Sequence, residues 1–112
     1  MSAIRVLEYL DASGRSPFRR WFENLDATAA ARVSAYLYRL EQGNFSRVKG
    51  VGGGVFELRI DFGPGYRVYF GKDGDTIVIL LGGSAKKRQD TAIDAARKAW
   101  PDYKRRKRGW TK

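Results

Sequence analysis

The chain has 112 residues, enough for one domain with a single modest core. It contains no cysteine and no histidine, which excludes disulfides and thiolate catalysis and removes the usual general base and the commonest metal ligand. The formal net charge is +10; residues 86–112 carry 11 Lys and Arg against 3 Asp and Glu, whereas residues 1–85 carry 11 against 9. This concentration of charge favours a polyanionic partner over the simpler explanation, a solubilising tail.

The N-terminal part is expected to contain one strand followed by a helical hairpin. Residues 4–10 alternate weakly between polar and apolar side chains and predict the strand. Ser16 and Pro17 are typical of a helix start, and an apolar stripe at helical spacing follows over residues 18–25. The second helix is expected over residues 27–42.

The glycine-rich stretch 44–54 is interpreted as a flexible approach to the sheet that carries two cations, Arg47 and Lys49. Its glycines do not match the phosphate-binding pattern GxxxxGK[ST]. Two antiparallel strands are expected next, over residues 57–62 and 66–70, joined by a three-residue Gly-Pro-Gly loop.

Alternation gives this strand pair one wholly apolar face and one polar face. On the polar face, the three-residue loop places Asp61 beside Arg67 and Arg59 beside Tyr69. We expect both arginines on this face, where Arg67 would pack against no other side chain. The simpler interpretation is a solvated outer face with an Asp61–Arg67 ion pair.

Residues 76–81 are apolar after the threonine and predict a strand covered on both faces. We expect Val78 and Leu80 on the face opposite the core, covered by the last helix or by a partner. That helix is expected over residues 86–100, and the basic tail 101–112 is expected to be only partly ordered. Residues 1–100 would form the single domain.

The element order β-α-α-β-β-β-α predicts an α+β fold, a twisted and mostly antiparallel sheet with the helical hairpin packed on one face. No apolar run approaches the roughly 20 residues needed to span a bilayer. The N-terminus also lacks the features of a secretory signal peptide. We therefore expect a cytoplasmic protein without a membrane partner.

In this order and spacing, GVFELRIDFGPGYRVYF followed by TIVILLGGSAKKRQ resembles the RelE/ParE superfamily of type II toxin–antitoxin toxins. Within it, the chain is most similar to the HigB-like addiction module killer group. The resemblance covers roughly residues 15–100. It implies a RelE-like fold and an endoribonuclease that cleaves mRNA in the ribosomal A site. It also implies a cognate antitoxin, expected to be of helix-turn-helix type and encoded by an adjacent gene.

The resemblance also indicates site residues. Arg67 matches the arginine of the family's YR[VL]-Y strand, and Arg59 lies where members carry a cation on the preceding strand. Lys86 and Lys87 fall where members carry a basic residue after the last strand. These four are the expected catalytic residues. Further RNA contacts are expected from the remaining basic and aromatic candidates, Arg47, Lys49, Tyr69, Arg88, Lys104, Arg105 and Arg106.

Self-cleavage of RNA through its 2′-hydroxyl needs a base, stabilisation of the phosphorane charge and an acid. Arginines and lysines suit the second task, and Lys86 or Lys87, expected to lie beside Arg67 in the folded sheet, is the candidate base. The resembled family also offers a tyrosine or a histidine as base, but this chain has no histidine, and Tyr103 is its only tyrosine beyond the last strand. Neither a metal nor another cofactor is expected. Two alternatives stay open at this point: a non-enzymatic ParE-like toxin that binds DNA gyrase, and a nucleic-acid-binding module without catalysis.

Overall fold

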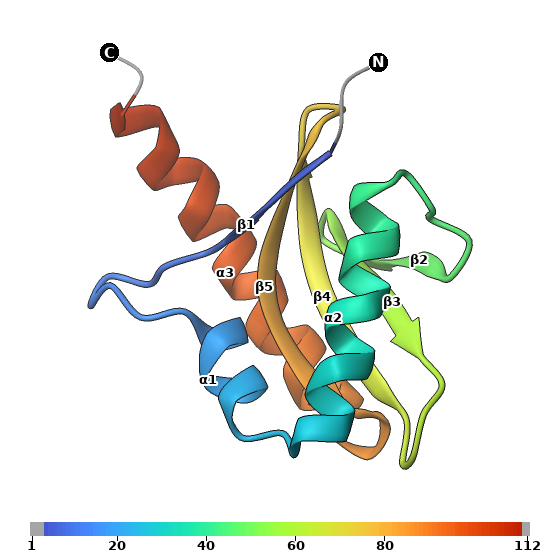
Figure 1. The fold of residues 1–112 in the computed structure, drawn as a ribbon. Coiled ribbons are helices and arrows are strands. Elements are labelled where there is room, and N and C mark those ends of the chain that lie inside the picture. Colours follow the sequence, from blue (N-terminus) through green and yellow to red (C-terminus); the bar gives the residue numbers. More distant parts are fainter. Residues whose placement is uncertain (1–3, 111–112) are drawn as a thin grey trace.

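The computed structural model describes the backbone of residues 4–110 and the side chains of residues 4–107. Its elements in chain order are β1 (Arg5–Glu8), α1 (Pro17–Glu23), α2 (Ala27–Glu41), β2 (Val48–Gly52), β3 (Val55–Ile60), β4 (Tyr66–Asp73), β5 (Ile77–Ala85), the 3₁₀ turn η1 (Lys86–Arg88) and α3 (Gln89–Trp110). The five strands form one sheet in the order β1-β5-β4-β3-β2, with β1 parallel to β5 and the other pairs antiparallel. Helices α1 and α2 lie on one face and α3 on the other (Figure 1). The predicted α+β class is confirmed.

The strand β2 was missed, because its stretch was interpreted as a flexible approach to the sheet. The segment instead pairs with β3, with Val48 opposite Leu58 and Lys49 opposite Glu57. Gly52, Gly53 and Gly54 all have positive φ angles and form the turn that reverses the chain. Glycine and lysine are poor strand formers, so an edge strand that buries little carries almost no sequence signal.

The register of β3 and β4 differs from the prediction by two residues. Five residues, 61–65, connect the strands, and Arg59 lies directly opposite Arg67. A turn within this loop is closed by the Gly65 N–H, which donates to the Phe62 carbonyl at 2.9 Å. Because two residues is one full period of a strand, the predicted faces are preserved. The pairs on the polar face are not, and the expected Asp61–Arg67 ion pair was wrong.

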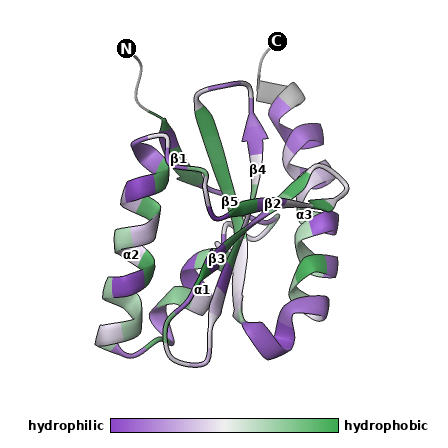
Figure 2. Cartoon of the chain, turned by 90° about the vertical axis from the view of Figure 1, so that its right-hand side faces the viewer, coloured by the Kyte–Doolittle hydropathy of each residue, from purple (hydrophilic) through white to green (hydrophobic). Residues whose placement is uncertain are grey.

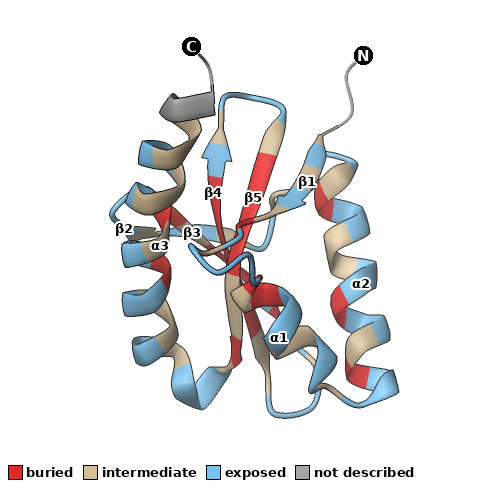
Figure 3. Cartoon of the chain, turned by 90° about the vertical axis from the view of Figure 1, so that its left-hand side faces the viewer, coloured by how far each residue is buried: buried red, intermediate tan, exposed pale blue. Residues whose placement is uncertain are grey.

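Strand β5 is covered on both sides, as its apolar sequence predicted. The three-residue turn 74–76 puts Ile77 opposite Asp73 and Leu80 opposite Phe70, an odd shift from the expected register; the bulge between Phe70 and Tyr69 lies beyond this segment. Val78 and Leu80 therefore lie in the core under α1 and α2, and their placement on the opposite face was wrong. Buried residues concentrate along β4 and β5, between the helical layers (Figure 3). Figure 2 shows that the upper part of β5 is strongly hydrophobic.

Each face of the sheet accommodates one tryptophan over a glycine. Trp21 of α1 packs on Gly83 of β5, and Trp100 of α3 packs on Gly71 of β4. A Cβ atom at Gly71 would lie 2.5 Å from the Trp100 ring. The second face is completed by a cluster that includes Tyr69, Leu81 and Trp100, and α3 is the element that buries it.

Helix α3 does not end at Trp100 but continues through Trp110, with Pro101 inside it. The expected helix end, and the partly ordered tail over the described residues 101–110, were wrong. The extension continues because Tyr103 stacks on Trp100 with ring centroids 5.3 Å apart, and its hydroxyl donates to Asp73 at 2.8 Å. From the N-terminal side, the Tyr9 hydroxyl donates to Asp102 at 2.6 Å. No helix within residues 4–110 is both long enough and apolar enough to span a bilayer.

Candidate nucleic-acid interface

An open groove lies at the end of the sheet where β3 and β4 are joined. It is lined by three cations, Arg59 of β3, Arg67 of β4 and Lys86 of η1, and by the loop between the two strands. The lining residues of the loop are Asp61, Phe62, Gly63, Pro64 and Gly65. The loop is anchored to the exit of β5, since the Lys86 N–H donates to the Gly65 carbonyl at 2.9 Å. The structure thus brings three of the four expected catalytic residues to one groove.

The two arginines of this groove are opposite one another but differ in exposure. Like charges directly opposed on a strand pair destabilise it unless they are compensated. The Arg59 side chain is 51% exposed, and its Nε lies 3.6 Å from Asp61. The Arg67 side chain is only 7% exposed. The expectation that Arg67 packs against nothing was therefore wrong; its guanidinium is held within the protein at the base of the groove.

Glu57 is the residue that compensates Arg67. Its side chain is 2% exposed, and its Oε1 lies 3.7 Å from Arg67 Nε and 3.8 Å from Lys49 Nζ. Its other oxygen accepts a 2.6 Å hydrogen bond from Gln89 Nε2 at the start of α3. Since a buried carboxylate is tolerated only with such partners, Glu57 fixes Arg67 from behind.

Arg67 keeps unused hydrogen-bonding capacity. Its Nη1 donates to the Tyr66 carbonyl at 3.0 Å, and its buried Nε faces Glu57, so the donors left for a ligand are those of the terminal nitrogens. An arginine offers five N–H donors in a planar fork, which suits two oxygens of one phosphate. The arrangement can therefore hold an anion between a fixed arginine, Arg67, and the two exposed cations, Arg59 and Lys86.

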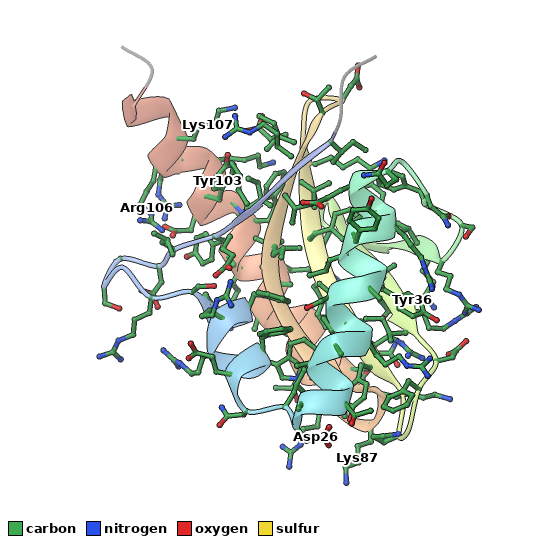
Figure 4. All side chains as sticks on the ribbon, viewed as in Figure 1. Asp26, Tyr36, Lys87, Tyr103, Arg106 and Lys107 are labelled. Carbon is green, nitrogen blue, oxygen red and sulfur yellow. The ribbon has the colours of Figure 1, made fainter. Side chains whose placement is uncertain are left out.

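Other expected RNA contacts lie around this groove. Arg47 on the segment before β2 donates to Asp61 at 2.7 Å, and Lys49 is 68% exposed beside Glu57. Lys87 and Arg88 are exposed on η1 but do not line the groove. Figure 4 shows Lys87 at this lower end of the molecule. The structure thus separates Lys87 from the groove that holds its neighbour Lys86.

Tyr69 cannot contact RNA in this structure. It is completely buried under α3, where its hydroxyl lies 3.2 Å from Ser84 Oγ. Burial raises the pKa of this phenol. The alternation that put Tyr69 on the polar face was right; the sequence did not show that α3 covers this part of the face.

The cations of the distal part of α3 lie at the opposite end of the molecule (Figure 4). Arg105 and Arg106 both pair with Asp102, at 2.5 and 3.0 Å, and Arg106 also donates to the Leu10 carbonyl. Lys104 lies over the Trp100 ring, with its Nζ 5.4 Å from the ring centroid. These three expected RNA contacts therefore do not join the groove.

The groove supplies cations, and the one tyrosine beyond the last strand lies outside it. Tyr103 is remote from it, and burial with the Asp73 hydrogen bond raises the Tyr103 pKa to about 12. Among the described residues, no cluster of three potential metal-ligating side chains occurs. Sequence reasoning did not assign a role to Glu57 or Gln89. Glu57 gave one signal, an acidic residue on the same strand face as the expected catalytic arginines.

Comparison with known proteins assigns the chain to a family. A model of the family of phage-derived Gp49-like proteins matches residues 20–104. The chain belongs to this Gp49-like family. Over 81 residues the Gp49-like protein is 44% identical to an uncharacterized protein of Haemophilus influenzae, covering 71% of this chain and 82% of that protein.

The fold of the Gp49-like protein is similar to that of a chain in the crystal structure of the toxin–antitoxin complex RelBE2 from Mycobacterium tuberculosis. The TM-score is 0.57 at 19% identity, with 75% of this chain and 99% of that chain covered. The RelE-type fold expected from the order of the motifs is thereby confirmed. Assignment to the HigB-like group stays a prediction.

Proposed function

We propose that this Gp49-like protein is the toxin of a toxin–antitoxin module and acts as a ribosome-dependent mRNA endonuclease. One observation carries the proposal: Arg59 and Arg67 are directly opposite each other across β3 and β4, and Lys86 faces the same open groove. Three cations converging on a groove suit the phosphodiester of an RNA strand. The Gp49-like family and the RelE-type fold support the toxin assignment.

In the proposed reaction the 2′-oxygen attacks the adjacent phosphorus, and the bond from phosphorus to the 5′-oxygen breaks. The 2′-hydroxyl proton leaves to a base, and the departing 5′-oxygen gains a proton. Arg67, fixed by Glu57, would stabilise the negative charge that develops on the phosphorane oxygens. Arg59 and Lys86 would orient the neighbouring phosphate oxygens, and Lys86 is the candidate for proton transfer.

The ribosome would supply the part that this groove lacks. Holding the mRNA so that the 2′-oxygen lies in line with the scissile bond can contribute roughly 7–11 kcal/mol in favourable intramolecular cases. Free RNA should therefore be bound but scarcely cut. The proposed partner that restrains this activity is an antitoxin of helix-turn-helix type encoded by the adjacent gene.

The test combines a growth assay with primer extension on translation reactions. The unaltered chain should arrest growth and cut mRNA in the ribosomal A site, while Arg59→Gln should relieve the arrest and lower cleavage by about 10²–10³-fold. Arg20→Gln, an exposed arginine of α1, is the matched control and should change neither. Absence of cleavage with every chain, together with inhibited gyrase supercoiling, would replace this proposal by the gyrase-binding alternative.

A further inference from the structure

Helix α2 carries two exposed arginines that the proposed site does not use. Arg32 and Arg39 lie with Tyr36 on one face of the helix, at spacings of four and three residues. Within the described part of the chain, neither arginine forms an ion pair with a carboxylate. Their positive charges are therefore uncompensated on the surface.

Aromatic rings hold these guanidinium groups in place. The Arg32 guanidinium carbon lies 4.7 Å from the centroid of the Phe62 ring. The Tyr36 ring has Arg39 at 4.8 Å and Arg47 at 5.9 Å from its centroid. A guanidinium packed over a ring loses little freedom when it binds a phosphate and keeps its charge. We call Arg32, Tyr36, Arg39 and Arg47 the α2 strip.

The α2 strip begins at the rim of the groove. Phe62, whose ring contacts the Arg32 guanidinium, lines the groove. Asp61, which pairs with Arg47 at 2.7 Å, also lines it. Asp61 is the one carboxylate within the described residues that contacts a cation of the strip. In Figure 4, Tyr36 lies on the flank of α2 that faces β3, far from the labelled Arg106 and Lys107.

We propose that the α2 strip binds the single-stranded RNA that continues out of the groove. Arg32, Arg39 and Arg47 would contact successive phosphates, and an unstacked base could stack on an exposed guanidinium plane. Arg32 and Arg39 are seven residues apart, about 10 Å along the helix. Successive phosphates advance about 3.4 Å along the axis of a stacked strand and lie further apart through space, so the strip is long enough to contact at least two of them. This inference rests on the proposed RNA target and extends it beyond the cut site.

The experiment uses fluorescence anisotropy with labelled single-stranded RNA of two lengths, a trinucleotide that fills only the groove and a dodecanucleotide that also reaches the strip. Arg32→Gln/Arg39→Gln should weaken binding of the dodecanucleotide several-fold and leave the trinucleotide unchanged. The slope of log K against log salt should become shallower by about 1.4, since a single strand contributes about 0.7 for each phosphate contact. Arg32→Lys/Arg39→Lys should keep the slope and lose part of the affinity, because the charge stays and the planar fork is lost.

The matched control is Arg20→Gln/Lys98→Gln, which removes two exposed cations from α1 and α3 and should bind both RNAs as the unaltered chain does. Equal losses in the control and in Arg32→Gln/Arg39→Gln would overturn the inference by showing a non-specific charge effect. Unchanged binding of the dodecanucleotide by Arg32→Gln/Arg39→Gln would also overturn the inference. If the unaltered chain still cuts mRNA in the A site, that result leaves the proposed function unaffected. A strip variant that binds RNA normally but no longer binds the antitoxin would assign the strip to an acidic protein segment instead. If the unaltered chain neither binds RNA nor cuts mRNA, both proposals fail.

Discussion

The two basic ends of this molecule use the same residue types in different ways. At the groove, Arg59 and Lys86 are exposed and Arg67 is fixed by Glu57, so that charge is directed into open space. At the distal end of α3, Asp102 holds two arginines, and Asp73 holds Lys107 at 2.6 Å together with the Tyr103 hydroxyl. Residues 101–112 alone carry six Lys and Arg against one Asp, half of the net charge of +10. The comparison shows that the number of cations in a segment does not measure the charge available to a ligand.

The largest expected effect concerns Glu57, on which the groove depends. Glu57→Ala leaves Arg67 buried without its partner, and breaking a buried pair costs about 3–5 kcal/mol of the free energy of unfolding. Asp61→Asn is the control, because Asp61 is 56% exposed and such pairs contribute at most about 1 kcal/mol. Urea unfolding followed by tryptophan fluorescence measures both.

A double-mutant cycle locates the source of that loss. Glu57→Ala/Arg67→Met should recover part of the stability, since it removes both buried charges. Additive losses from the two single changes would show that Glu57 does not act through Arg67.

The second effect separates the two ends by activity. Arg59→Gln should lower the cleavage rate in programmed ribosomes by about 10²–10³-fold, the range for removing one donor that stabilises developing charge. Lys104→Gln/Arg105→Gln, at the distal end, should leave the rate of a saturated complex within about a factor of two of the unaltered rate. A distal variant as inactive as Arg59→Gln would reverse the assignment of the two ends.

The third effect is structural and belongs to the distal end alone. Asp73→Asn removes the acceptor of Lys107 and weakens that of Tyr103, with an expected loss of about 1 kcal/mol. Asp75→Asn, in the same turn and exposed, should change nothing. Hydrogen exchange should show faster opening of residues 101–107 with Asp73→Asn, while the groove and A-site cleavage are unaffected.

The smallest effect is a dependence on pH. Hydrogen bonds from Lys107 and Tyr103 lower the pKa of Asp73 below 3.8, and that from Tyr9 lowers the pKa of Asp102. A lowered carboxyl pKa stabilises the fold fully above the unfolded value, and this contribution is lost as pH falls below about 3.8 through the folded value. The distal part of α3 should therefore open first on acidification, seen by hydrogen exchange. Simultaneous loss of exchange protection at the amides of β3 and β4 would contradict this expectation.

The sequence predicted what depends on periodicity and short-range signals. The helical hairpin followed from Ser16, whose side chain accepts from the Arg19 N–H at 2.9 Å, and from the apolar stripes. The faces of β3 and β4 followed from alternation, which is unaffected by a shift of two residues. Element types along most of the chain were therefore correct.

What the sequence did not predict depends on contacts between distant segments. Loop lengths decided the registers, and an odd shift at β4–β5 exchanged the faces of Val78 and Leu80. The coverage of Tyr69 and the pairing of Glu57 both depend on where α3 docks. Lys86 was correctly expected to lie close to Arg67, whereas the position of Lys87 depended on the direction of η1.

The closure of the sheet by the distal part of α3 has a consequence for the synthesis of the chain. The hydrogen bond from Tyr9 to Asp102 joins residues 93 positions apart, and the covering of Tyr69 and Leu81 needs Trp100. These residues are translated after every strand of the sheet, so one face of the sheet stays uncovered until α3 has been made. The buried Glu57 site likewise needs Gln89 of α3, so it cannot form while only the strands have been made.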